Sequence, residues 1–415
     1  MSTTAFLTTL GGTTGGNPMP DVHNNAHVHL PPNFTAFDTV EQAVDLAAAQ
    51  GVRVLGASNY YDYGVYRDFA ALARDRGVFP LFGLEIITLI DELLEAGVKI
   101  NDPGNPGKMY VCGKGITGFD PMNAEAAGLL EVIRRNDSER MEQMTSRMAE
   151  VFSANGVETG LDAAGVRARI ARRHGCPIER VYLQERHVAM AFQEAVFERV
   201  APADRPAALA TLFGVPSKSP DDPVGVQGEI RSYLMKTGKA AYVPETFVGF
   251  DHAYRLILAL GGIPCYPTLA DGTTPVCAHE ESVEDLIADL KARGVHCAEF
   301  IPIRNSPKVL GDYVRAMRRA GLVVTAGTEH NTLDLLPIAP TCLDGAPIPP
   351  DVQAVFDEGA CVVVAHQYLT ANGDSGFVDA ATGAPNPEYD TDDARIAAFA
   401  KLGAEVLARY QAAAA

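Results

Sequence analysis

Residues 24–32 read NNAHVHLPP, and this stretch decides how the chain begins its fold. In an extended strand successive side chains point to opposite faces, so His27 and His29 share one face and Val28 lies on the other. The two prolines that follow lack the N–H that a strand ladder requires, so the strand is expected to end just beyond the histidines. Both imidazoles are therefore expected near the C-terminal end of one strand.

The next segment has the pattern of a helix followed by a strand. Thr39 and Gln42 stand at capping-box spacing, and Gly51 ends an apolar helical face. The alternation then recurs, with helical stretches near 64–77, 281–293, 307–320 and 350–359 and apolar strand-like runs at 52–58, 78–86, 108–116, 261–269, 295–303, 321–327 and 361–367. Strands with continuous apolar runs are covered on both sides, so roughly seven or eight of them favour an α/β barrel with parallel strands.

The alternation breaks between residues 121 and 245, where charge-rich helical segments predict a helical insertion. We expect a flexible Gly/Thr-rich leader over residues 1–20 and a barrel made of 21–120 and 246–370. A loop and a helix are expected over residues 371–415.

The amino-acid composition indicates which classes of partner the chain is expected to bind. Its 415 residues include 52 acidic and 34 basic ones, for a net charge of −18, which disfavours nucleic acid and anionic membranes. The seven cysteines lie far apart with no Cys-x-x-Cys pair, as expected for reduced, buried thiols. We find no secretory signal pattern and no run of membrane-spanning length. The sequence predicts a cytoplasmic protein with a small-molecule substrate, and it leaves the oligomeric state open.

Polar residues at strand ends are the candidates for a site, because the strands of a barrel end at one rim. Glu85 ends the run at 78–86, and Glu329 follows the run at 321–327. With His27 and His29 these carboxylates make a set of two nitrogen and two oxygen ligands suited to one Zn, Mn or Fe ion. Each residue alone also has an ordinary explanation, as a surface or core histidine or as half of an ion pair. Their joint appearance at strand ends favours the metal site.

These motifs make the chain similar to the polymerase and histidinol phosphatase (PHP) superfamily, metal-dependent hydrolases with a distorted (β/α)7 barrel. The resemblance spans residues 20–120 and 255–335, and the motifs that carry it are NAHVHL (25–30), FGLEI (82–86), GGIPCYPTL (261–269), GVHCAEF (294–300) and GTEHN (327–331). It implies a distorted (β/α)7–8 TIM-like barrel of PHP type with a helical insertion. It also places His27, His29, Glu85 and Glu329 on the ligands of one metal ion.

The chain departs from the family at the other metal positions, since members usually hold several ions. Asn59 and Tyr60 stand where an Asp-His pair is expected, and Tyr266 stands where the family has histidine. Phenols hydrogen-bond well beside a polar substrate. We therefore interpret the centre as a single-metal site with Tyr60 and Tyr266 as catalytic residues that contact the substrate. His330 is the candidate general acid or base, because imidazole changes charge near neutral pH.

Several further residues are predicted to bind the substrate: Asn59, Lys114, Arg186, His187, Lys239, Arg304 and His366. The function that the resemblance implies is metal-dependent hydrolysis of a small polar substrate, with a phosphoester as one candidate, through a metal-activated water. The alternatives are a metal-dependent lyase or isomerase acting on a sugar-like substrate, or a PHP-like protein that binds metal or ligand without catalysis.

Overall fold

Seven strands form one sheet in a computed structural model that describes residues 22–414, so the predicted leader lies outside the described residues. Neighbours in the sheet follow the order of the sequence. The strands are β1 (Asn24–Val28), β2 (Val54–Ala57), β3 (Phe79–Leu89), β4 (Lys108–Lys114), β5 (Ile263–Thr268), β6 (Cys297–Phe300) and β7 (Val323–Ala326).

The sheet nearly closes into a barrel where β1 meets the chain that follows β7. Val28 forms a parallel bridge with Glu329, the His29 N–H donates to the Glu329 carbonyl at 3.0 Å, and the Thr328 N–H donates to the His27 carbonyl at 3.0 Å. The coarse prediction of an α/β barrel is therefore confirmed.

One strand departs from the predicted parallel arrangement. β4 pairs antiparallel with both β3 and β5, whereas the other neighbours are parallel. Parallel neighbours need a crossover, but antiparallel neighbours connect at the same end. The segment between β3 and β4 holds only the five-residue helix α3 (Asp91–Glu95) and makes no crossover.

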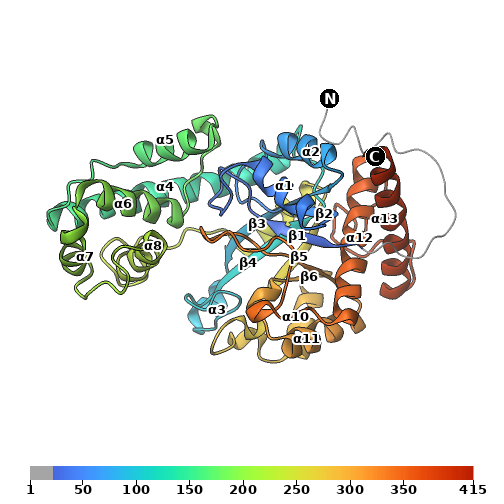
Figure 1. The fold of residues 1–415 in the computed structure, drawn as a ribbon. Coiled ribbons are helices and arrows are strands. Elements are labelled where there is room, and N and C mark those ends of the chain that lie inside the picture. Colours follow the sequence, from blue (N-terminus) through green and yellow to red (C-terminus); the bar gives the residue numbers. More distant parts are fainter. Residues whose placement is uncertain (1–21, 415) are drawn as a thin grey trace. The chain divides into compact units, whose positions relative to one another are not determined.

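Helices surround the sheet of the barrel. The Thr39 hydroxyl caps the first of them by accepting from the Gln42 N–H at 3.1 Å, as the capping-box spacing predicts. These helices are α1 (Val40–Ala49), α2 (Tyr66–Asp75), α9 (Phe250–Ala259), α10 (Val283–Ala292), α11 (Pro307–Arg319), α12 (Pro350–Ala371) and α13 (Asp392–Ala414). In Figure 1 the last two lie side by side, and both pack against strands of the barrel.

The predicted strand over residues 361–367 is wrong, because these residues lie within α12. Within this stretch the helix is buried on nearly all sides, so its residues are mostly apolar. A continuous apolar run is equally typical of a buried helix and of a buried strand. Close packing depends on two glycines. A Cβ at Gly359 would meet the Val324 carbonyl at 2.0 Å, and a Cβ at Gly403 of α13 would meet the Cys361 carbonyl at 1.8 Å.

The chain divides into two compact units. The barrel unit contains the described chain up to Leu30, Thr39–Leu130 and the chain from Val248 onward, and the helical unit contains Pro31–Asp38 and Glu131–Phe247. Helix α4 (Ala124–Ala154) continues from the first unit into the second, which also holds α5 (Ala163–His174), α6 (Glu185–Arg199), α7 (Arg205–Phe213) and α8 (Pro223–Ile230). The core of the helical unit includes an edge-on contact between Phe152 and Phe192, with ring centroids 4.9 Å apart.

Short helical turns complete the described chain. They are η2 (Ile178–Arg180), η3 (Pro202–Asp204), the π-helix η4 (Arg231–Met235), η5 (Ala270–Gly272), η6 (Ala278–Glu280), η7 (Pro302–Arg304) and η8 (Leu343–Gly345). All seven cysteines lie in the described residues, and each is a free thiol, as the spacing predicts. Across residues 22–414, no helix combines the length and the apolar character that crossing a membrane requires.

Candidate metal centre

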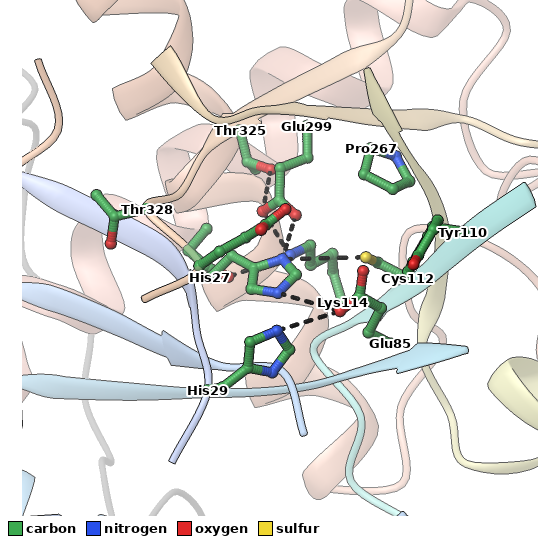
Figure 2. A network of polar contacts seen from close by, with 12 residues as sticks. His27, His29, Glu85, Tyr110, Cys112, Lys114, Pro267, Glu299, Thr325 and Thr328 are labelled. Atoms are coloured by element: carbon green, nitrogen blue, oxygen red, sulfur yellow. Dashed lines mark hydrogen bonds and ion pairs between the residues drawn. The ribbon is translucent and has the colours of Figure 1, made fainter. Parts of the chain in front are cut away.

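Two histidines from the end of β1 and one carboxylate from β3 converge inside the barrel unit (Figure 2). The Nε2 atoms of His27 and His29 lie 3.8 and 3.2 Å from Glu85 Oε2. All three side chains are buried, and each offers one ligand atom within 4.8 Å of the others. The structure thus brings together three of the four predicted metal ligands.

The ligand atoms of this group have no hydrogen-bond partners within the described chain. His27 Nε2, both ring nitrogens of His29 and Glu85 Oε2 are all buried in this state. Buried polar atoms without partners are costly, so such a cluster indicates a missing partner. Two imidazoles and one carboxylate form the donor set of many catalytic zinc sites, and the same set also suits iron. The residues present therefore fit a divalent metal ion.

Glu299 and Lys114 form a hydrogen-bonded pair on the Nδ1 side of His27. Glu299 Oε1 accepts from His27 Nδ1 at 2.6 Å, and Glu299 Oε2 accepts from the Lys114 ammonium at 2.5 Å. Burial acts to raise the pKa of Glu299, but the Lys114 ammonium and His27 together outweigh it and hold that pKa below its usual value. A carboxylate only accepts, so His27 Nδ1 carries a proton, and the other ring nitrogen, Nε2, is the one that faces Glu85.

This supporting pair was incompletely anticipated by the sequence. Lys114 was predicted to bind substrate, but its ammonium is buried and donates to Glu299 and to the Ala26 carbonyl at 3.1 Å. No role was predicted for Glu299, although a carboxylate inside the apolar run VHCAEF is a signal that it must be paired. Cys112 also lies here, with its sulfur 4.0 Å from His27 Nδ1. Burial raises the pKa of its thiol well above the usual value.

The fourth predicted ligand, Glu329, is paired with arginine in this structure. Arg304 Nη1 donates to Glu329 Oε1 at 2.9 Å, while Arg304 Nη2 and the Asn331 amide donate to the other oxygen. Burial acts to raise the pKa of Glu329, but Arg304 together with His27 and His29 outweighs it and lowers that pKa to about 2. Ligation by Glu329 and substrate binding by Arg304 stay predictions, since both groups already satisfy each other here.

Glu329 and His330 have left-handed backbone conformations, with φ of 56° and 53°. Consecutive non-glycine residues in this region carry strain, which persists where the surrounding contacts impose it, often at functional sites. The His330 ring faces Thr328 Oγ1 through Nδ1 at 2.7 Å and the Leu336 carbonyl through Nε2 at 2.9 Å. Burial lowers the pKa of His330. Both nitrogens are engaged, so its role as general acid or base stays a prediction.

The two predicted catalytic tyrosines differ in their surroundings. Tyr60 stacks on His29 with ring centroids 5.1 Å apart and planes inclined by 11°, and burial together with Glu85 raises the pKa of its phenol well above the usual value. The Tyr266 hydroxyl instead donates to Glu280 Oε1 at 2.8 Å. The structure therefore places Tyr60 against the metal group and ties Tyr266 to a separate buried carboxylate.

Asn59 positions the chain around the group. Its side chain accepts from the Leu30 N–H at 2.8 Å and donates to the Leu30 carbonyl at 3.0 Å, and its carbonyl accepts from the Glu85 N–H at 3.3 Å. These bonds link the segment after His29 to the strand that carries Glu85. Asn59 was predicted to contact substrate, and here its amide is committed to the backbone.

The remaining predicted substrate residues lie elsewhere. His366 on α12 donates to the Gly261 carbonyl at 2.8 Å and accepts from the Phe377 N–H at 3.0 Å, and burial lowers its pKa to about 4, as for a neutral core histidine. In the helical unit, burial lowers the pKa of His187 to about 3, and its ring packs against Phe34 with centroids 5.5 Å apart. The Arg186 guanidinium lies 5.8 Å from the same ring, and Lys239 is exposed. Substrate contacts by these residues stay predictions.

A nearly closed seven-stranded sheet with a buried His-His-Glu group defines an α/β barrel with a candidate metal centre. Solved structures share this fold, among them the following two. One is a candidate metal-dependent phosphoesterase from Bifidobacterium adolescentis, 16% identical, with a TM-score of 0.53, 81% of this chain and 95% of that chain covered. The other is an amidohydrolase from Chromobacterium violaceum with bound sulfate and no metal, 20% identical, with a TM-score of 0.50, 80% of this chain and 97% of that chain covered. No protein-family model and no curated protein matches the sequence. At 16% and 20% identity, the likeness to these two structures shows the fold alone.

Proposed function

We propose that the chain is a PHP-type hydrolase with one divalent metal ion, acting on a small polar substrate such as a phosphoester. The observation that carries the proposal is the convergence of His27, His29 and Glu85, whose buried ligand atoms have no hydrogen-bond partners among the described residues. The two proteins of similar fold support it, because one is a candidate metal-dependent phosphoesterase and the other is an amidohydrolase.

When bound, a divalent ion supplies a Lewis acid that polarises a substrate oxygen and lowers the pKa of water. The chain supplies orientation and a proton donor. Glu299 holds the proton of His27 on Nδ1, so that Nε2 stays available as a ligand. Tyr60 remains protonated at neutral pH because burial and Glu85 raise the pKa of its phenol. This hydroxyl is engaged by Glu85 in a side-chain hydrogen bond, so we infer that a substrate oxygen beside His29 would take the donor over from Glu85.

Metal content tests the centre directly. Purified wild-type chain expressed with Zn, Mn and Fe in excess should retain about one ion per chain by mass-spectrometric metal analysis, and His29→Ala and Glu85→Gln should retain none. His23→Ala is the matched control, since His23 is an exposed histidine just before β1 and should leave metal content unchanged. Metal retention by both site variants would show that the ligand assignment is wrong.

The reaction class requires a second measurement. With phosphomonoesters and phosphodiesters as probes in ¹⁸O-labelled water, hydrolysis places solvent oxygen in a product. A lyase or isomerase would instead exchange carbon-bound hydrogen with solvent when sugar-like compounds are tested in deuterated water. A folded chain that binds metal and turns over neither class would overturn the hydrolase proposal in favour of a binding protein.

A further inference from the structure

A second potential metal group lies directly behind the first. His27, Cys112 and Glu299 are all buried and each offers a ligand atom within 4.8 Å of the others. The two groups share His27, whose Nε2 faces Glu85 and whose Nδ1 faces Glu299 (Figure 2). The arrangement of side chains alone would therefore allow two ions on opposite sides of one imidazole.

A cation from the chain already occupies the second group. The Lys114 ammonium lies 2.5 Å from Glu299 Oε2 and 3.1 Å from the Ala26 carbonyl oxygen. A carboxylate and a backbone carbonyl are also the oxygen ligands that hard divalent cations take. Lys114 is only 2% exposed, so its charge is neutralised inside the protein rather than by solvent.

The hydrogen bond between His27 and Glu299 is a second obstacle to an ion in this group. Glu299 Oε1 lies 2.6 Å from His27 Nδ1, which carries a proton because the carboxylate accepts only. An ion bound by Glu299 and His27 Nδ1 would have to displace both that proton and the ammonium. The first group faces neither obstacle, because its nitrogens and Glu85 Oε2 have no hydrogen-bond partners among the described residues.

We propose that the ammonium of Lys114 takes the place of a second metal ion and thereby limits this centre to one. The inference rests on the proposed metal-dependent function and adds the reason for its nuclearity. Removal of the ammonium leaves Glu299 buried without its cation, and a divalent ion then supplies the missing charge, releasing the protons of His27 Nδ1 and the Cys112 thiol to solvent as it binds. Lys114 is on this basis a residue that determines how many ions the site accepts.

The experiment compares wild type, Lys114→Ala and Lys108→Ala after equilibrium dialysis against excess Co²⁺. Lys108 is the matched control, because it is a buried lysine on the same strand, pairs with Asp102 at 3.3 Å, and lies about 20 Å along β4 from Lys114. Wild type and Lys108→Ala should bind one ion per chain. Lys114→Ala should bind two, show a cobalt–thiolate absorption band, and gain more thermal stability from added Co²⁺ than wild type. The double variant Lys114→Ala/Cys112→Ser should lose the band.

Each alternative outcome has a separate meaning. A folded wild-type chain that binds no ion overturns the proposed function and the inference with it. Two ions on wild type, or one or none on Lys114→Ala beside one on wild type, overturn the inference alone. A Lys114→Ala chain that stays unfolded in excess Co²⁺ also overturns it, because a divalent ion then does not substitute for the ammonium.

Discussion

The substitution Glu299→Gln should change both the stability of the chain and its metal affinity, because Glu299 binds a lysine and a ligand histidine. Glu299 is fully buried and accepts from Lys114 at 2.5 Å and from His27 Nδ1 at 2.6 Å. The substitution leaves the Lys114 ammonium buried without its counter-charge, which should lower the free energy of unfolding of the metal-free protein by about 3–5 kcal/mol. Metal affinity should fall about 10–100-fold, because loss of a carboxylate behind a ligand histidine weakens that ligand.

Two measurements separate these effects. Urea unfolding in the presence of a chelator gives the stability of the metal-free chain, and competition with a chromophoric chelator gives the affinity for Zn²⁺. The double variant Glu299→Gln/Lys114→Met removes both charges and should recover much of the lost stability without recovering metal affinity. The reasoning is refuted if Glu299→Gln is as stable as wild type, or if the double variant is less stable than Glu299→Gln.

Two further predictions concern the backbone beside the site and a buried acid outside it. Gly327→Ala would place a Cβ 2.4 Å from His27 Cβ, so we expect it to lower the free energy of unfolding by about 1–3 kcal/mol and to weaken Zn²⁺ binding in the same competition assay. The control is Gly128→Ala, whose added Cβ meets no described atom within 4 Å and which should keep the wild-type affinity for Zn²⁺. Equal Zn²⁺ affinity in the two variants would contradict the expected displacement of His27. Burial raises the pKa of Glu280 from the usual 4.5 to about 7, so the folded protein binds this proton more tightly than the unfolded chain, and wild type should lose stability as pH rises from 4.5 to 7. The stability of Glu280→Gln relative to wild type should therefore increase by about 3 kcal/mol over that window in urea unfolding, and a pH-independent difference would rule out the titration.

The sequence was a good guide where local pattern and burial act together. Alternating helices and apolar strands predicted the barrel, and the Thr39 cap was predicted from spacing alone. His27 and His29 had to share a face because of strand geometry, and Glu85 was singled out as a carboxylate within an apolar run. The structure brings these three residues together in one buried group.

Other features depend on tertiary partners that the sequence does not specify. The stretch at 361–367 is apolar on every side because α12 is covered by strands on one side and α13 on the other, so its helical period is invisible. The reversal of β4 leaves no mark in a strand that is buried either way. The ion pairs of Lys114 with Glu299 and of Arg304 with Glu329 were not predicted, because the partners are far apart in the sequence.

The bridge between Val28 and Glu329 joins the two ends of the sheet at the same place where the histidines lie. About three hundred residues separate these partners, so a chain that stops before β7 keeps the pairing of β1 with β2 but leaves the other edge of β1 without its partner. The backbone that carries both histidines is therefore held on both edges only when the last strand is in place. A copy truncated before β7 keeps His27, His29 and Glu85 in its sequence but loses Glu329 and the bridge that holds one edge of the histidine strand.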